Sequence, residues 1–422
     1  MAPVEPRTAP VTHDDVVAAA ARIGGEVVHT PTARSRTLGE ITGADVFVKF
    51  ENLQFTASYK ERGALNRLLL LPAGTGGVVT ASAGNFGQGV AHHAGRLGLP
   101  ATIVVPVTTP LLKIGRIELL GATVVRHGES FEEANRHAAR LAVERDLVLL
   151  SPFDDADVVA GQGTVALELL DDVPDVEVLV IPTGGGGLLA GTVIAVAGSR
   201  PTVEVIGVQS ERYPAVHNAL TGATLPVGGG TIADGIAVAD PGASTLDVLR
   251  RHRPSIELVA EEVIEEAIGL YLEVEKTVAE GAGAAPLAAL LARPERYRGR
   301  CVGLVLSGGN IDLRQLASVT LRSLVRSGRL ATVRIELVDR PGSLGDLTTA
   351  IGRLGGNIVE VTHQRLDLAV HARSTSVTVT IETAGRAHLE RLLDELVRSG
   401  HHIRLPVGGD EGWAPHGPAG AS

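Results

Sequence analysis

The chain of 422 residues has one cysteine, Cys301, few aromatic residues and no long apolar run. A single cysteine excludes an intrachain disulfide and a metal cluster held by several thiolates, and it fits a reducing compartment. No stretch approaches the roughly 18 to 20 apolar residues of a membrane span, and the N-terminal segment lacks the apolar core of a signal peptide. We therefore expect a cytoplasmic protein that is neither exported nor membrane-bound.

The chain also has no concentration of positive charge. Its 38 basic and 48 acidic residues give a net charge of -10, and no run of lysine or arginine forms a track for nucleic acid. A hydrophobic fraction of 44% with 20% charged residues describes a soluble globular protein. We expect small-molecule partners and no nucleic acid, in a chain long enough for two or three structural units.

Strands and helices alternate over the first three quarters of the chain. Thr12 caps a predicted helix, Asp45–Phe50 is a predicted strand, and βαβ rhythm runs from Gly77 to Leu150 and again from Val176 to Leu306. The strands are almost continuously apolar, which is typical of a parallel sheet covered on both faces. This predicts two α/β lobes with ligands at the carboxyl ends of the strands.

After residue 330 the pattern changes. In two segments apolar and polar residues alternate with period two, and in two others the apolar residues have helical spacing. This pattern predicts a ferredoxin-like βαββαβ unit over 330–405. The predicted organisation is a disordered start over 1–11, a catalytic domain over 12–326 with a small lobe at about 51–160 inserted in a large lobe, a linker around 323–329, and a disordered tail over 406–422.

Lys60 is conspicuous because the chain has only four lysines. It follows Ser58, a good N-cap residue, and precedes a helical pattern, so it should lie on the first turn of a helix. An amine held there can act as a nucleophile toward an aldehyde, whereas an isolated lysine at a helix start is usually only solvated.

Three turns with glycine follow predicted strands. Gly184 to Gly187, followed by Leu188, open an apolar helix and can direct backbone N–H groups at an anion; a tight structural turn is the alternative. The second turn, Ser82-Ala83-Gly84-Asn85-Phe86, can hold a carboxylate, although Ser82 alone could be a helix cap. The third begins at Ser307 and puts a hydroxyl at a sheet edge.

Together these motifs resemble the fold-type II pyridoxal-phosphate enzymes of the threonine and serine dehydratase group, which are tryptophan synthase β-like, with a C-terminal ACT domain. The resemblance covers residues 12 to 405. The motifs that carry it are Ser58-Tyr59-Lys60, Ser82-Ala83-Gly84-Asn85, Pro152-Phe153-Asp154-Asp155, Gly161-Gln162-Gly163-Thr164, the glycines 184–187, Thr231-Ile232-Ala233-Asp234-Gly235, Glu280-Gly281-Ala282-Gly283 and Ser307-Gly308-Gly309-Asn310.

The resemblance implies pyridoxal 5'-phosphate as cofactor. Lys60 would hold it covalently and act as catalytic base, with Tyr59 beside it. Gly184, Gly185, Gly186, Gly187 and Leu188 would hold the phosphate, Asn85 would bond the phenolic oxygen, and Ser307 would face the pyridine nitrogen. A serine there favours β-elimination over transamination. Ser82, Ala83, Gly84, Asn85 and Phe86 would bind the substrate carboxylate.

The sequence departs from the pattern of the family at three places. Phe86 replaces a common histidine, either packing on the cofactor or reshaping the substrate pocket, and Tyr59 replaces a phenylalanine beside Lys60. Ala83 replaces the serine that racemases use as a base, which argues against racemase activity. The cation-binding carboxylates of that subgroup are also replaced, around Gln209 and Ala215. We predict no metal site, with His92-His93 on a helix surface and His401-His402 at a strand edge.

The C-terminal unit resembles an ACT domain, and the resemblance implies that it binds an amino-acid effector, usually across a dimer interface, although a purely structural dimerisation unit is an alternative. The resemblance implies an effector site near Asp339, Gly342, Ser343 and Leu344, together with Asn357 and Ile358. It also implies assembly as a homodimer or homotetramer. Isoleucine and valine are the effectors to try first.

The resulting hypothesis is a lyase that eliminates water from L-threonine, or L-serine, to give 2-oxobutanoate, or pyruvate, and ammonia. Three alternatives remain: a lyase for a specialised substrate such as 3-hydroxyaspartate, a β-replacement synthase, and a catalytically silent amino-acid sensor. The presence of Lys60 argues against the sensor.

Overall fold

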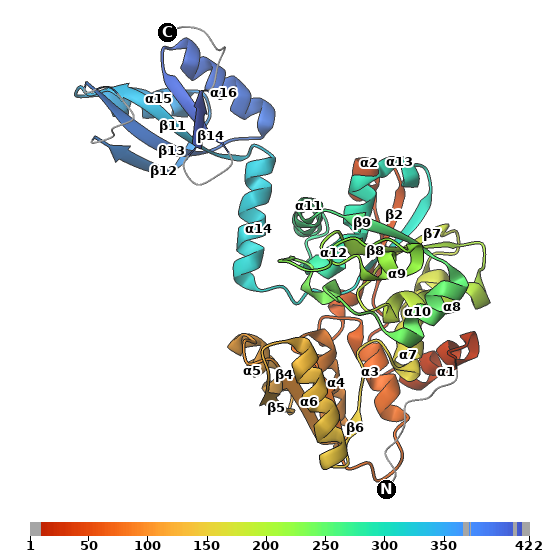
Figure 1. The fold of residues 1–422 in the computed structure, drawn as a ribbon. Coiled ribbons are helices and arrows are strands. Elements are labelled where there is room, and N and C mark those ends of the chain that lie inside the picture. The colour runs from red at the N-terminus through yellow and green to blue at the C-terminus, as the bar shows by residue number, and fades with distance from the viewer. Residues whose placement is uncertain (1–9, 366–370, 372, 408–411, 416–422) are drawn as a thin grey trace. The chain divides into compact units, whose positions relative to one another are not determined.

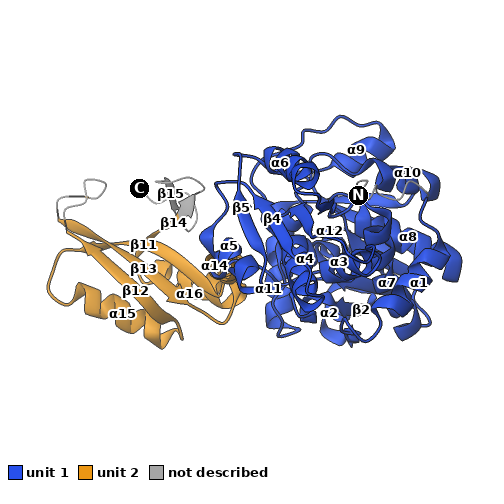
Figure 2. Cartoon of the chain, turned by 90° about the horizontal axis from the view of Figure 1, so that it is seen from below, with its two compact units in different colours: residues 1–313 blue, residues 314–422 orange. Residues whose placement is uncertain are grey.

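The computed structural model describes residues 10–365, 371, 373–407 and 412–415, in two compact units (Figures 1 and 2). Unit 1 covers residues 1–313 and unit 2 covers residues 314–422. The division falls at the start of helix α14 (Leu313–Arg326), before the predicted boundary at residue 326, because this amphipathic segment continues as a helix through most of the predicted linker. Among the described residues, no helix has both the length and the apolar character to cross a membrane.

The larger lobe of unit 1 is built on a six-stranded sheet. Its spatial order is β1 (Thr32–Ser35), β2 (Asp45–Phe50), β10 (Cys301–Leu306), β7 (Val178–Pro182), β8 (Glu204–Ser210) and β9 (Ser255–Val259). All neighbours are parallel except β1 and β2. The two middle strands β10 and β7 are separated by more than a hundred residues in sequence. The centre of the sheet therefore forms only when distant segments of the chain meet.

Helices cover both faces of this sheet (Figure 1). They are α1 (His13–Ile23), α2 (Arg36–Thr42), α7 (Ala156–Asp172), α8 (Gly187–Ser199), α9 (Ala215–Thr221), α10 (Ala243–His252), α11 (Glu261–Glu273), α12 (Gly281–Ala292) and α13 (Pro294–Tyr297), with 3-10 turns η1 (Glu51–Leu53) and η2 (Asp234–Ile236). Thr12 starts α1 with a reciprocal capping box to Asp15. Helices α8 and α12 are apolar on all sides because neighbouring layers enclose them.

The smaller lobe is inserted between β2 and β7. Its parallel sheet has the order β5 (Thr123–Arg126), β4 (Ala101–Val105), β3 (Val78–Ala81) and β6 (Val148–Leu149), with helices α3 (Lys60–Leu69), α4 (Asn85–Arg96), α5 (Leu111–Leu119) and α6 (Phe131–Glu144). Helix α3 contacts both α4 and the large-lobe helix α7, so it lies where the two lobes meet.

Unit 2 has the predicted βαββαβ order: β11 (Leu330–Val338), α15 (Ser343–Arg353), β12 (Asn357–Gln364), β13 (Ser374–Glu382), α16 (Arg386–Arg398) and β14 (His402–Val407). Its apolar core lies between the sheet and the helices. A further strand, β15 (Gly412–Pro415), pairs with β14, which corrects the predicted structureless tail at these residues. The predictions for 1–9, 408–411 and 416–422 fall outside the described residues.

Candidate active site

Lys60 is the first residue of α3, at the junction of the two lobes. Its backbone N–H donates to the Ser58 hydroxyl at 3.3 Å, although Tyr59 rather than Ser58 is the residue at the helix boundary. The side chain is half-buried. Its Nζ lies 5.1 Å from the Tyr59 ring centroid and 3.4 Å from the Pro152 carbonyl oxygen. The amine is therefore accessible but fixed in place by its surroundings.

Lys60 and the glycine turn line one pocket. The pocket is lined by Tyr59, Lys60, Phe153, Pro182, Thr183, Gly184, Gly185, Gly186, Gly187, Leu188, Gly235, Ile236 and Val238. The structure thus brings together seven residues that the sequence suggested as cofactor-binding, from two distant segments. Phe153, Ile236 and Val238 were not among the predicted site residues, although Phe153 belongs to one of the recognised motifs and Ile236 and Val238 follow another.

The glycine turn is shaped to receive an anion. Gly186 has φ 94° at the start of α8 and offers no side chain to cap it, so the first N–H groups of the helix are available to a ligand. A Cβ on Gly185 would run into the Phe153 ring, and one on Gly187 would lie 3.1 Å from the Phe153 Cα. Thr245 fixes the turn by donating to the Gly185 carbonyl at 2.8 Å. Only small residues fit in this turn, and its free backbone N–H groups can donate hydrogen bonds to a phosphate.

Asn310 ties the loop of Lys60 to the other two turns. Its Nδ2 donates to the Thr56 carbonyl at 2.7 Å and to Asn85 Oδ1 at 2.9 Å. The Tyr59 N–H donates to the Ser307 carbonyl at 3.1 Å. Asn85 and Ser307 do not line the pocket around Lys60, but these bonds place both next to the Lys60 loop.

Glu280 is a buried carboxyl group in this same cluster. It accepts a hydrogen bond from Asn85 Nδ2 at 2.8 Å. Burial, aided by the negative charge of Asp234, raises the pKa of Glu280 to about 7. This carboxyl can hold a proton near neutral pH. Sequence reasoning recognised its motif but gave Glu280 no role.

The second turn connects β3 to α4. Ser82 to Asn85 are partly exposed, and no side chain caps the start of α4, so backbone N–H groups there can bind a carboxylate. Phe86 is 2% exposed, and its ring packs in the core of the small lobe. The proposed contribution of Phe86 to substrate binding is thus limited to its backbone, because its ring fills the core.

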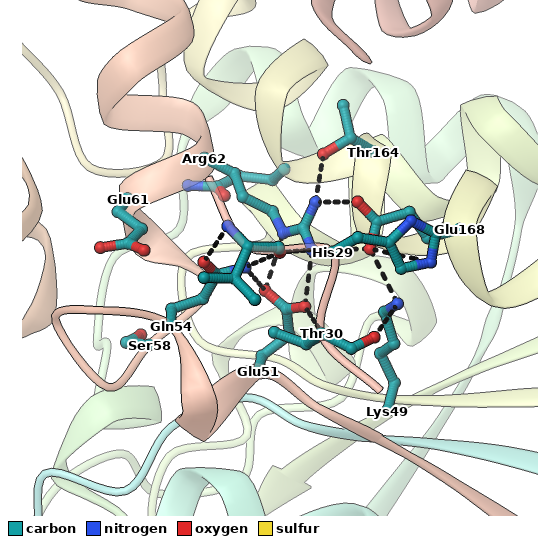
Figure 3. A network of polar contacts seen from close by, with 12 residues as sticks. His29, Thr30, Lys49, Glu51, Gln54, Ser58, Glu61, Arg62, Thr164 and Glu168 are labelled. Carbon is teal, nitrogen blue, oxygen red and sulfur yellow. Dashed lines mark hydrogen bonds and ion pairs between the residues drawn. The ribbon is translucent and has the colours of Figure 1, made fainter. Parts of the chain in front are cut away.

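A buried ionic network fixes the segment that follows Lys60 (Figure 3). The Arg62 guanidinium donates to Glu51 Oε2 at 2.7 Å and Oε1 at 2.8 Å, and to Glu168 Oε1 at 2.6 Å and Oε2 at 2.8 Å. Lys49 Nζ lies 2.7 Å from Glu168 Oε2. Burial raises the pKa of Glu51, but the charge and hydrogen bonds of Arg62 outweigh it and leave that pKa lowered. The network anchors the first turn of α3 to the large lobe.

The predicted effector residues do not come together within one chain. Gly342 stands uncapped at the start of α15, after the end of β11, with Asp339 nearby. Asn357, at the start of β12, lies level with the opposite end of β11, because Leu330 and Asn357 both pair with Glu382 while Val338 pairs with Ser374. The length of a nine-residue strand, roughly 25 Å, separates the two groups. The predicted effector residues of one chain therefore form two separate groups, and the effector site stays a prediction.

The prediction that His92 and His93 lie on a helix surface is wrong for His93. His93 is 1% exposed and does not lie on a helix surface, because α4 packs it against α3. His92 is partly exposed, and its ring stacks on Phe55 at 4.1 Å between centroids.

Comparisons with known proteins agree on both units. The sequence profile described as "Pyridoxal-phosphate dependent enzyme" matches residues 23–308, and the one described as "ACT domain" matches residues 331–398. An L-threonine ammonia-lyase of Thermotoga maritima is 40% identical over 399 residues, which is 94% of this chain and 99% of that protein.

Two solved structures are each similar to about three quarters of the chain. Threonine deaminase isoform 2 of Solanum lycopersicum superposes with a TM-score of 0.71 and 32% identity, covering 77% of this chain and 93% of the other. Maize serine racemase gives a TM-score of 0.69 and 29% identity, over 75% and 99% of the two chains.

Proposed function

The chain belongs to the pyridoxal-phosphate-dependent enzymes, in the threonine ammonia-lyase family, and carries a C-terminal ACT domain; from this premise we propose that it converts L-threonine to 2-oxobutanoate and ammonia by β-elimination of water. L-Serine is a second substrate of the same chemistry and would give pyruvate. The observation that carries the proposal is the pocket in which Lys60 faces an uncapped glycine turn at a helix start. The name and the coverage of the Thermotoga relative support the choice of threonine.

The residues of the pocket fit the cofactor. Bound pyridoxal phosphate supplies an electron sink that weakens the bonds at the α-carbon of an amino acid. The N–H groups at Gly184 to Gly187 would bind its phosphate, and Lys60 would hold it covalently. The pocket also includes the Tyr59 ring, beside Lys60. We assign Asn85 to the phenolic oxygen and Ser307 to the pyridine nitrogen.

Proton movement falls to Lys60 and its neighbours. Once substrate has displaced it, the Lys60 amine would take the α-proton. The start of α4, with Ser82 and the N–H groups of Gly84 to Phe86, would hold the substrate carboxylate and so direct the α-proton toward Lys60. Glu280 would keep the Asn85 amide oriented through their hydrogen bond.

Racemisation is the alternative to exclude, since the fold is shared with maize serine racemase. Inverting the α-carbon needs a second base on the opposite face. In racemases the family resemblance places a serine at this position, whereas this chain has Ala83, whose side chain cannot act as a base. Elimination needs only the base on the Lys60 face.

A substrate panel tests the proposal. L-Threonine, L-serine and 3-hydroxyaspartate are supplied separately, and oxo acid, ammonia and D-amino acid are measured, with and without an added thiol. We expect equal amounts of 2-oxobutanoate and ammonia from L-threonine, unchanged by the thiol. A dominant D-amino acid would favour a racemase, and a dominant thioether product would favour β-replacement.

Replacing Gly186 with alanine should weaken binding of pyridoxal phosphate. Gly186 has φ 94°, and an added Cβ would lie 3.1 Å from Thr245 Oγ1. A left-handed conformation costs a residue with a side chain roughly 1 to 2 kcal/mol, so Kd should rise about 5- to 30-fold. Fluorescence titration of cofactor-free protein measures it.

Gly222→Ala is the matched control. Gly222 ends α9 with φ 76° and carries the same backbone penalty, but it does not line the pocket. It should lower stability and leave the cofactor Kd unchanged. Equal weakening in both variants would show that Gly186→Ala acts through global stability alone.

We also propose that the ACT domain binds an amino-acid effector between two copies of the chain. The α15 start with Asp339 to Leu344 offers uncapped N–H groups for a carboxylate, and Asn357 with Ile358 offers an amide and an apolar side chain. Since these groups lie at opposite ends of one sheet, a second copy must supply the partner group, which requires at least a homodimer.

Mixed dimers test this arrangement. Gly345→Leu, whose side chain would enter the open space at the start of α15, and Asn357→Ala should each abolish the response to isoleucine or valine. Dimers that combine one chain of each variant should retain one intact site and recover about half of the effector binding measured by calorimetry. No recovery in mixed dimers would place the site within a single chain.

A further inference from the structure

A cluster of three side chains lies outside the pocket, where α3 and α4 pack together. Glu61 belongs to the first turn of α3, and His92 and His93 belong to the last turns of α4. One potential ligand atom from each, a carboxylate oxygen or a ring nitrogen, lies within 4.8 Å of the other two. The proposed catalytic steps use none of the three.

The close contact of the two helices creates the cluster. Gly89 lies against Glu61, where an added Cβ would be 3.1 Å from the Glu61 Cα. His92 and His93 follow Gly89 by about one turn of α4, which brings their rings beside the Glu61 carboxylate. Figure 3 shows that this carboxylate lies apart from the Arg62 network.

Within the described part of the chain, His93 has no hydrogen-bond partner for either ring nitrogen, although it is 1% exposed. A buried imidazole without partners is rare, because it loses its bonds to water and gains nothing in return. An imidazole nitrogen without a hydrogen-bond partner can offer its lone pair to a metal ion, so the unpartnered His93 ring has the donor that a ligand requires.

Glu61 can supply an oxygen ligand. Its Oε2 accepts from the Thr56 N–H at 3.1 Å and the Thr56 hydroxyl at 2.8 Å, while among the residues that the structure describes its Oε1 accepts only from the Phe55 N–H, at 3.2 Å. A carboxylate has about four lone-pair positions, so Oε1 can accept another partner. Arg96, which follows the two histidines on α4, is paired with Glu26.

We propose that Glu61, His92 and His93 form a binding site for one divalent transition-metal ion, with zinc as the best match. Two imidazoles and a carboxylate are zinc ligands, and a water molecule would complete four-coordination on the exposed side of His92. Ligand atoms in tetrahedral zinc sites lie about 3.3 to 3.5 Å apart, so the three groups need to close by no more than about 1.5 Å. The bound ion would clamp α3 to α4 one residue from Lys60.

Metal titration of the holoenzyme tests the site. Full-length protein without an affinity tag is freed of metal with a chelator and titrated with ZnCl2 alone by calorimetry, and with CoCl2 alone by visible absorption. We expect one zinc equivalent per chain, an intense tetrahedral cobalt spectrum, and a rise in Tm on adding zinc.

Variants locate the binding. Glu61→Gln and His93→Ala should each weaken zinc binding by at least roughly 100-fold, because each removes a ligand. His92→Ala removes a partly exposed ligand and provides the same test if the buried variants misfold. His137→Ala is the control, since His137 and His127 are a second pair of neighbouring histidines in the small lobe, stacked with 3.9 Å between their ring centroids.

Three results would overturn the proposal: no stoichiometric zinc binding by the wild type, equal binding in all four variants, or a loss confined to His137→Ala. The last result would assign the ion to the other histidine pair. Because binding is measured without turnover, these results are independent of whether L-threonine is the substrate.

Discussion

Lys60→Ala protein should lose turnover of L-threonine by at least about 10³-fold. The variant lacks both the amine that would hold the cofactor and the base that would take the α-proton, and proton transfer by a positioned side chain alone contributes about 10²- to 10⁴-fold. Oxo-acid formation at saturating cofactor measures the loss. Borohydride reduction followed by peptide mass analysis should locate the cofactor on Lys60 in the wild type and on no lysine in the variant.

Lys276→Ala is the control for this change. Lys276 is exposed and bonds the Glu273 carbonyl at 2.6 Å, away from the pocket. It should keep full turnover and the labelled Lys60 peptide. If Lys60→Ala protein retained wild-type turnover, both the assignment of Lys60 and the elimination mechanism would fail.

Arg62→Met should lower the free energy of unfolding of unit 1 by about 3 to 5 kcal/mol. Arg62 and Glu51 are both fully buried, so methionine would fill the space of the arginine but leave the Glu51 carboxylate buried without its cation. Denaturant unfolding at fixed cofactor concentration, followed by the visible signal of the bound cofactor, measures the change.

The difference in the free energy of unfolding between wild type and Arg62→Met should also depend on pH. The lowered pKa of Glu51 contributes stability above its unfolded value, near 4.5, and that contribution is lost as the pH falls through the folded pKa. Removal of Arg62 reverses the preference, because protonation then relieves a buried charge. The gap between wild type and Arg62→Met should therefore narrow as the pH falls toward about 4.5, where the variant takes up a proton on Glu51, and narrow further below about 4.5, where the wild type loses its contribution.

Two further variants separate charge pairing from packing. Arg250→Ala breaks an exposed pair with Asp247, separated by 3.3 Å, and should change stability by less than about 1 kcal/mol. Adding Glu51→Gln to Arg62→Met should restore part of the loss, since it removes the unpaired charge. If the double variant were as unstable as Arg62→Met, packing rather than charge would explain the effect.

Much of the architecture could be predicted from the sequence because its signals are local. Near-continuous apolar strands separated by helices predicted the two α/β lobes, and the switch to alternation after residue 330 predicted the βαββαβ unit. The glycines at 184–187 and the isolated Lys60 were recognisable because a helix start that binds an anion excludes side chains, and a nucleophilic amine needs a lysine. Those requirements are met by a few consecutive residues.

Only the tertiary structure decided which distant groups meet. Phe153 and Ile236 complete the pocket, and Asn310 and Glu280 tie three turns together, because parallel strands far apart in sequence align their carboxyl ends. The burial of His93 depends on Gly89, which lets α3 and α4 approach closely. In unit 2, the strand order separates Asp339 from Asn357 by the length of the sheet. Contacts of this kind depend on strand order and helix packing, which the residues on either side of a motif do not encode.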